Sequence, residues 1–152
     1  MTAHIGSPRV WPRLRVDDWT ETRETLHMWT QIVGKIRLSQ APLINHWWQV
    51  TQYVSPRGLT TGTIPYRGGS FDLELDVTAH CLRVRSSAGE ERLVALSSRP
   101  VADFYAETMK ALHELGIEVT IDARPNEVDP AIPFAQDDQH ATYDPAAAHL
   151  FW

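Results

Sequence analysis

Acidic, histidine and tyrosine residues near the C-terminal end form the first group that could do chemistry. Asp137 and His140 lie three positions apart, and Tyr143 follows three positions later. A carboxylate and an imidazole at this spacing can take a proton from an amine, so we predict Asp137 and His140 as catalytic residues and Tyr143 as a substrate contact. No metal is expected, because His140 has no second histidine at helical spacing. The alternative is that these side chains only form the polar entrance of a helix that begins at Asp144.

A second group lies on segment 43–54, where β-branched and aromatic residues predict a strand. Trp47 and Trp48 would point to opposite faces of this strand, so both faces are expected to be covered. In the functional interpretation the strand is the floor of a pocket, with His46 as a catalytic base and Trp48 as a wall. In the structural interpretation it belongs to a two-sided core, where His46 and Gln52 satisfy backbone groups.

A third group surrounds the turns that follow this segment. Guanidinium groups, hydroxyl groups and exposed amides together can bind a carboxylate, sulfate or phosphate and stabilise it as it leaves. Gly68 and Gly69 would let the backbone approach such a group closely. The alternative is an exposed hairpin end, where arginine and glycine are common. The residues predicted to bind this anionic ligand are Arg57, Thr60, Thr61, Tyr66 and Arg67.

The elements that must position these groups follow from the spacing of apolar residues. Asp18 and Glu21 have the form of a capping box, which predicts a helix that ends near residues 39–42. Alternation of apolar and polar residues, clearest in 70–77, then predicts five strands. These strands are expected at 43–54, 59–66, 70–77, 80–85 and 92–96.

The remaining elements complete the predicted fold. A second helix is expected from Pro100 to Gly116, followed by a short strand at 117–121. The proline-rich segment 124–143 has no periodicity and predicts a functional loop or an arm laid on a neighbour. Together they predict one α+β domain over residues 1–152, with a mostly antiparallel, twisted sheet of five or six strands packed with two helices.

The last helix is expected to lie at an interface. It begins at Asp144, and the sequence ends on Leu150, Phe151 and Trp152. A helix this short is marginal in isolation, and its apolar end predicts a partner that covers it. We therefore expect half of a larger two-half protein, or one subunit of a heteromer, with a second related half or subunit docked on this helix.

Composition excludes several classes of protein. The chain has 152 residues, 14 Lys+Arg against 19 Asp+Glu, a formal net charge of −5 and no dense basic cluster, so no nucleic-acid partner is expected. It has neither a signal-peptide pattern nor an apolar run of about 18 residues, which predicts a cytoplasmic location and no membrane partner.

Cys81 is the one cysteine, so no internal disulfide can form. No nucleotide-binding loop, nucleophile elbow or zincin string is present, and no cofactor is expected.

Four strings of the sequence carry a resemblance to a known family: WPRL at 11–14, LINHWWQVTQY at 43–53, SPRGL at 55–59 and VADFYAETM at 101–109. They resemble an uncharacterised, mainly actinobacterial family catalogued as a domain of unknown function. The resemblance covers nearly the whole chain. It implies a protein about twice this length, of which this chain is similar to the N-terminal half.

A weaker resemblance, suggested by the half length, is to one subunit of the two-subunit enzyme that forms the aziridine ring in azinomycin- and vazabitide-type biosynthesis. No catalytic residue is carried over from that enzyme. The resemblance implies a subunit of a metal-independent biosynthetic enzyme that closes an aziridine ring by intramolecular displacement of sulfate. Its substrate would be a small anionic molecule, which a carrier protein could deliver. The alternative function is a non-catalytic binding or assembly module.

Overall fold

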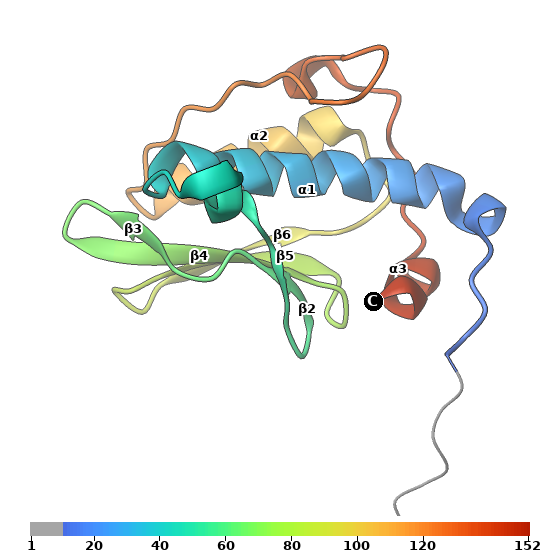
Figure 1. The fold of residues 1–152 in the computed structure, drawn as a ribbon, viewed down its shortest axis with the longest axis horizontal. Helices are drawn as coiled ribbons and strands as arrows, with labels where there is room; N and C mark the ends of the chain where they lie inside the picture. The colour runs from blue at the N-terminus through green and yellow to red at the C-terminus, as the bar shows by residue number, and fades with distance from the viewer. Residues whose placement is uncertain (1–10) are drawn as a thin grey trace, which may run out of the picture.

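The computed structural model describes residues 11–152, which form an open antiparallel sheet with helices on one face (Figure 1). The sheet has six strands in the order β1-β2-β4-β5-β6, with β3 also paired to β4. The predicted α+β class and the mostly antiparallel sheet are confirmed. The strands are β1 (Tyr53–Val54), β2 (Gly58–Thr60), β3 (Ile64–Tyr66), β4 (Gly69–Asp76), β5 (Cys81–Ser86) and β6 (Glu91–Ala95).

Strand β4 has the predicted apolar and polar faces. Phe71, Leu73 and Leu75 are buried in the core beneath the helices. Asp72 and Glu74 alternate with them and form ion pairs with Arg85. Because successive side chains of a strand point to opposite faces, the alternation along the sequence directly gives one apolar and one charged face of the sheet.

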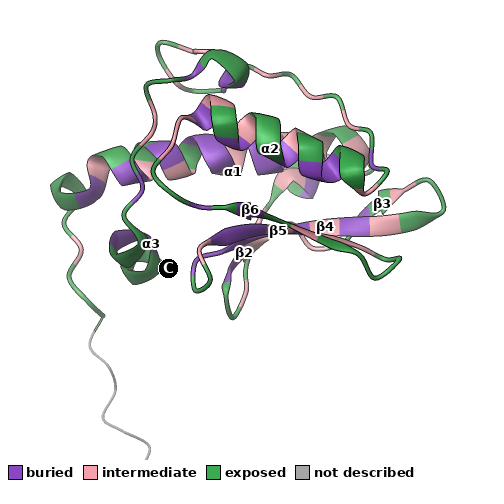
Figure 2. Cartoon of the chain, turned by 180° about the vertical axis from the view of Figure 1, so that it is seen from behind, coloured by how far each residue is buried: buried purple, intermediate pink, exposed green. Residues whose placement is uncertain are grey.

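Two helices cover the apolar face of the sheet. α1 (Thr20–Gln40) follows a short 3₁₀ turn, η1 (Val16–Trp19), and α2 (Val101–Glu114) lies beside it (Figure 1). Apolar residues recur three and four positions apart on each helix, so they share one face, and that face is buried (Figure 2). The buried residues of the two helices include Met28, Trp29, Ile32, Val33, Ile36, Val101, Phe104 and Leu112.

The ends of these helices agree only partly with the predictions. The first residue of α1 is preceded by Trp19, which provides no side-chain cap, so the capping box predicted at Asp18 is wrong. Glu21 instead accepts a hydrogen bond from the hydroxyl of Thr142. Gly116 follows α2 with a φ of 70°, a left-handed conformation that glycine adopts without a steric penalty.

Segment 43–54 is not the predicted strand. It forms a short 3₁₀ segment, η2 (Asn45–Val50), in which His46 and Trp47 have φ angles of 55° and 61°. Local hydrogen bonds close this turn: the amide of Trp47 donates to the carbonyl of Ile44, and the amide of Ile44 donates to the buried side chain of Gln49. Because these local partners satisfy the backbone, only Tyr53 and Val54 reach the sheet as β1.

Two further predicted strands differ from the structure. Segment 59–66 is two short strands, β2 and β3, which pair with different parts of β4. Between them, the amide of buried Thr61 donates to the carbonyl of Leu73, and its hydroxyl, instead of its carbonyl, accepts from the amide of Leu73. The side chain thus replaces one of the two hydrogen bonds that a straight strand would make through its backbone. Segment 117–121 is not a strand, although Ile117 is buried in the core and the amide of Glu118 donates to the hydroxyl of Tyr66.

The C-terminal segment crosses back over the helices to the other end of α1 (Figure 1). It contains a short 3₁₀ turn, η3 (Phe134–Gln136), and the final helix α3 (Pro145–Phe151). Asp144 caps α3 by accepting hydrogen bonds from the amides of Ala146 and Ala147, as predicted. In the part of the chain that the structure describes, no helix is both long and apolar enough to cross a membrane.

Candidate functional site

The predicted catalytic pair, Asp137 and His140, is in direct contact. Oδ2 of the buried Asp137 lies 2.7 Å from Nδ1 of His140. Oδ1 of Asp137 accepts hydrogen bonds from the amides of Gln139 and His140. Asp137 therefore both folds the loop and fixes the orientation of the imidazole, which is the arrangement a catalytic histidine needs.

The same loop also has a structural role. The carbonyl oxygens of Asp137 and His140 accept hydrogen bonds from the amides of Ala102 and Val101, at the start of α2. The first amides of a helix have no hydrogen-bond partner within the helix, so the carbonyl groups of this loop serve as their acceptors. This capping accounts for the position of the pair, and its catalytic role stays a prediction.

Tyr143, the predicted substrate contact beside this pair, is a core residue. Its ring lies 5.3 Å from that of Trp29, and its hydroxyl is 2.9 Å from Nδ1 of His80. Burial, together with the nearby charge of Asp144, raises the pKa of Tyr143 to about 12. The hydroxyl therefore stays protonated at neutral pH and joins the C-terminal segment to the turn before β5.

His46 and Trp48 do not line a common pocket. Both are exposed on η2, and the side chain of Trp48 is 63% exposed. The predicted pocket floor depended on a strand at 43–54, and the turn that replaces it directs these residues toward solvent. Their predicted roles as base and wall are not tested by the structure, which places neither of them in a cavity.

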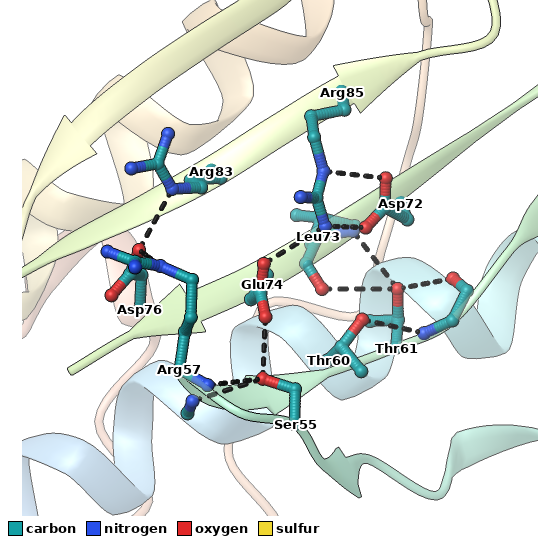
Figure 3. Close-up of polar contacts among 12 residues, drawn as sticks. Ser55, Arg57, Thr60, Thr61, Asp72, Leu73, Glu74, Asp76, Arg83 and Arg85 are labelled. Carbon is teal, nitrogen blue, oxygen red and sulfur yellow. Dashed lines mark hydrogen bonds and ion pairs between the residues drawn. The ribbon is translucent and has the colours of Figure 1, made fainter. Parts of the chain in front are cut away.

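The predicted anion-binding residues are separated along β4, and Figure 3 shows three of them, Arg57, Thr60 and Thr61. Arg57 lies at the Asp76 end of β4, and its Nε is 2.6 Å from Oδ2 of Asp76. Arg67 lies beside Gly69 at the other end, where it pairs with Glu118 at 3.3 Å. The two arginines therefore cannot bind one small anion, and each already has a protein carboxylate as its partner.

The remaining members of that group also have protein partners. The hydroxyl of Thr60 accepts from the amide of Gly62, and the hydroxyl of Thr61 donates to the carbonyl of Gly62. The hydroxyl of Tyr66 accepts from Glu118, and its ring lies under the guanidinium of Arg67. These five residues stabilise turns and strand ends in the structure.

A ladder of charged residues covers the outer face of the sheet (Figure 3). Oδ2 of the fully buried Asp76 accepts hydrogen bonds from Arg57 and from Arg83, which lies 2.9 Å away. Burial alone would raise the pKa of Asp76, but hydrogen bonds from two arginines, a threonine hydroxyl and a backbone amide hold that pKa well below its usual range. The carboxylate is therefore charged at neutral pH.

A largely apolar cavity of about 520 Å³, which we call the edge pocket, lies between α1, the β1–β2 end of the sheet and α3. α3 is held there by its own chain: the rings of Trp19 and Phe151 are 4.7 Å apart, and the amide of Asp144 donates to the hydroxyl of Thr22. The residues that line the edge pocket are Trp19, Arg23, Leu26, His27, Thr30, Val54, Leu59, Leu75, Val77, Ala148, Phe151 and Trp152.

The polar residues of the edge pocket all come from one face of α1. Arg23, His27 and Thr30 are spaced three and four positions apart, so they lie along one side of the helix. The opposite walls, from the sheet and α3, are apolar. An apolar cavity with a few polar groups on one side is the usual form of a small-molecule site.

A second hollow of about 810 Å³, with more polar residues in its lining, adjoins the edge pocket, and His27 and Thr30 line both. Several of its polar groups are paired with one another. Nζ of Lys35 lies 2.9 Å from Oδ1 of Asn126, and the side chain of Gln31 exchanges hydrogen bonds with the backbone of Asn126. These contacts attach segment 122–127 to α1, which gives this hollow a structural explanation.

The edge pocket was missed by the sequence predictions, although one signal for it was present. Phe151 and Trp152 were recognised as apolar residues that need a cover, and in the structure they form one wall of this pocket. Leu150 and Phe151 remain 41% and 59% exposed, so a partner docked on α3 stays a prediction. Among residues 11–152, no three His, Cys, Asp or Glu side chains gather in a way that could hold a metal ion.

The fold and the pocket together define an α+β domain with an open antiparallel sheet and a largely apolar cavity at one sheet edge. A family model described as a family of unknown function (DUF5996) matches residues 11–152, so the chain belongs to this family. The predicted membership of a family of unknown function is thereby confirmed. No curated protein and no solved structure gives a significant match to the chain.

Proposed function

We propose that this chain binds a small molecule whose apolar body occupies the edge pocket. The observation that carries the proposal is the cavity itself: its volume of about 520 Å³ falls in the usual range for ligand sites, and most of its lining is apolar. Leu59, Leu75 and Val77 supply the sheet wall, while Phe151 and Trp152 supply the wall on α3. A ligand that fills this space removes these side chains from water, which is the main driving force for binding.

A cavity-filling substitution tests this proposal. Leu59 is half-buried and lines the pocket. Leu59→Trp therefore places a bulky indole ring in the space that the ligand would occupy. We expect the affinity for the fluorescent probe 1-anilinonaphthalene-8-sulfonate to fall at least tenfold, measured by titration of the folded protein. Such a change corresponds to about 1.4 kcal/mol of binding free energy.

The matched control is Leu93→Trp. Leu93 is 56% exposed and belongs to β6, which is the edge strand opposite β1. This variant should bind the probe as the parent chain does, and near-ultraviolet circular dichroism should confirm that both variants are folded. Equal binding by the two tryptophan variants would contradict the proposal.

A narrower function, suggested by the resemblance to the aziridine-forming enzyme, is ring closure on a β-amino sulfate ester. In this reaction the amine nitrogen forms a bond to the carbon that bears the sulfate, the carbon–oxygen bond breaks, and sulfate leaves with the electron pair. A base must take the proton from nitrogen. The 2.7 Å contact between Asp137 and His140 supports this candidate, because an oriented imidazole is a suitable base.

Sulfate release from O-sulfo-ethanolamine tests the narrower function. We expect His140→Ala to lower the rate by about 10²–10⁴-fold, the usual contribution of a general base. His113→Ala is the control, since His113 is exposed at the end of α2. If the parent chain releases no more sulfate than the buffer does, this candidate fails while ligand binding in the edge pocket can still hold.

A further inference from the structure

Arg23 lies at the edge pocket with unused hydrogen-bond donors. Within the described residues it forms one ion pair, with Oε1 of the adjacent Glu24 at 3.9 Å, a distance longer than a hydrogen bond. Every arginine from Arg37 to Arg124, by contrast, donates a hydrogen bond to a protein oxygen. A guanidinium group has five N–H donors, so Arg23 can bind a ligand without breaking an internal hydrogen bond.

His27 lies one helical turn after Arg23 and also lines the pocket. Its Nε2 is 3.1 Å from the side-chain nitrogen of Gln31, which is an amide donor. Nε2 therefore accepts that hydrogen bond, and the proton of the neutral ring is on Nδ1. The N–H of Nδ1 adds a second donor on the same side of α1 as Arg23.

The lining of the edge pocket contains these two basic residues and no carboxylate. Arg23 is therefore a local positive charge in a chain whose formal net charge is −5. An ammonium group placed there would meet the charge of Arg23 and find no carboxylate in the lining to pair with, whereas a carboxylate or sulfate would receive charge-assisted hydrogen bonds.

We infer that the ligand of the edge pocket is an amphipathic anion, with an apolar body inside the pocket and a carboxylate, sulfate or phosphate group bound by Arg23 and His27. This inference rests on the proposed function, since it assigns the head group of a molecule whose body fills the same cavity. Arg23 supplies the charge, and His27 supplies a second N–H donor. The five anion-binding residues predicted from the sequence have no part in this site.

Three probes with the same eight-carbon chain test the head group: octyl sulfate, octanol and octylammonium. Isothermal titration calorimetry below the micelle concentrations, at constant ionic strength, gives the three affinities. We expect octyl sulfate to bind about tenfold more tightly than octanol, and octylammonium to bind more weakly than octanol. Circular dichroism in the presence of each probe confirms that the fold is intact.

Three variants test whether Arg23 and His27 cause the tighter binding of octyl sulfate. Arg23→Gln should weaken octyl sulfate binding about tenfold and leave octanol binding unchanged, and His27→Phe should produce a smaller loss of the same kind. Arg92→Gln is the control, because it removes the same charge from β6, where Arg92 pairs with Glu114. It should change neither affinity.

The outcomes separate this inference from the proposed function. If octanol binds, Leu59→Trp prevents its binding, and octyl sulfate is not preferred, the pocket is a ligand site and the anion inference is overturned. The inference is likewise overturned if Arg23→Gln weakens all three probes equally. If none of the probes binds to the parent chain, both the proposed function and the inference fail.

Discussion

Replacing Trp29 with alanine is expected to lower the free energy of unfolding by about 3–5 kcal/mol, the usual cost of removing a large aromatic side chain from a core. Trp29 is fully buried on α1. Its ring stacks on Phe104 of α2 at 4.7 Å and lies 5.3 Å from Tyr143, in the segment that leads to α3. One substitution therefore weakens the contact among three parts of the chain that are distant in sequence.

A second variant separates packing from hydrogen bonding at this position. Nε1 of Trp29 is buried without a hydrogen-bond partner among the described residues. Trp29→Phe therefore loses volume but no polar contact, and we expect it to cost only about 1–2 kcal/mol. Trp48→Ala, at a 63% exposed position, should change stability by less than about 0.5 kcal/mol.

Urea unfolding of the three variants measures these differences. The urea concentration at the midpoint reports the change in stability, provided that the dependence of the unfolding free energy on urea concentration is the same in each variant. A Trp29→Ala variant as stable as Trp48→Ala would contradict the central position of Trp29 in the core. A phenylalanine variant as unstable as the alanine variant would mean that the indole nitrogen, rather than the ring area, stabilises the fold.

The second large effect is expected at Asp76, where alanine should lower the free energy of unfolding by about 2–4 kcal/mol at neutral pH. The carboxylate is fully buried and accepts hydrogen bonds from Arg57, Arg83, the hydroxyl and amide of Thr78, and the amide of Ala79. The cost is below that of a fully buried pair because the side chain of Arg57 is 48% exposed and can be hydrated after the substitution.

The contribution of Asp76 should depend on pH in a defined direction. Its pKa in the folded chain is lowered, since the hydrogen bonds to the carboxylate outweigh the effect of burial. The stability it adds is therefore fully present above the unfolded pKa of about 3.9 and is lost as the pH falls below that value. The stability difference between the parent chain and Asp76→Ala should shrink when unfolding is measured at pH 3 rather than pH 7.

Asp138→Ala is the control for this experiment, because Asp138 is exposed. It should change stability by less than about 0.5 kcal/mol at either pH. A stability difference at Asp76 that stays constant from pH 7 to pH 3 would show that the carboxylate acts through packing alone rather than through its charge.

The local features of this fold could be predicted because their causes lie within a few residues. The alternation along β4 determines which residues face the helices, and the three- and four-residue spacing on α1 and α2 determines which face is buried. Asp144 caps α3 through amides two and three positions later. The Asp137–His140 contact is equally local, because the two residues are three positions apart.

The errors arose where a residue's partner is remote or where local bonds compete with the sheet. Segment 43–54 has the residue types of a strand, but the buried side chain of Gln49 accepts the amide of Ile44 and stabilises a turn. Segment 117–121 alternates as a strand does, yet the backbone amide of Glu118 donates to the side-chain hydroxyl of Tyr66 rather than to the backbone of a strand. Propensity could not predict either outcome.

The sequence by itself therefore determined the α+β class, the two faces of the sheet, and the identity of the apolar residues at the C-terminal end. Only the tertiary structure decided which polar groups are free to act. It pairs Arg57 with Asp76 and Arg67 with Glu118, and it brings α1, the end of the sheet and α3 together around the edge pocket. The physical reason is that periodicity records whether a side chain faces water or the core, whereas a cavity and its spare donors depend on contacts between segments far apart in the chain.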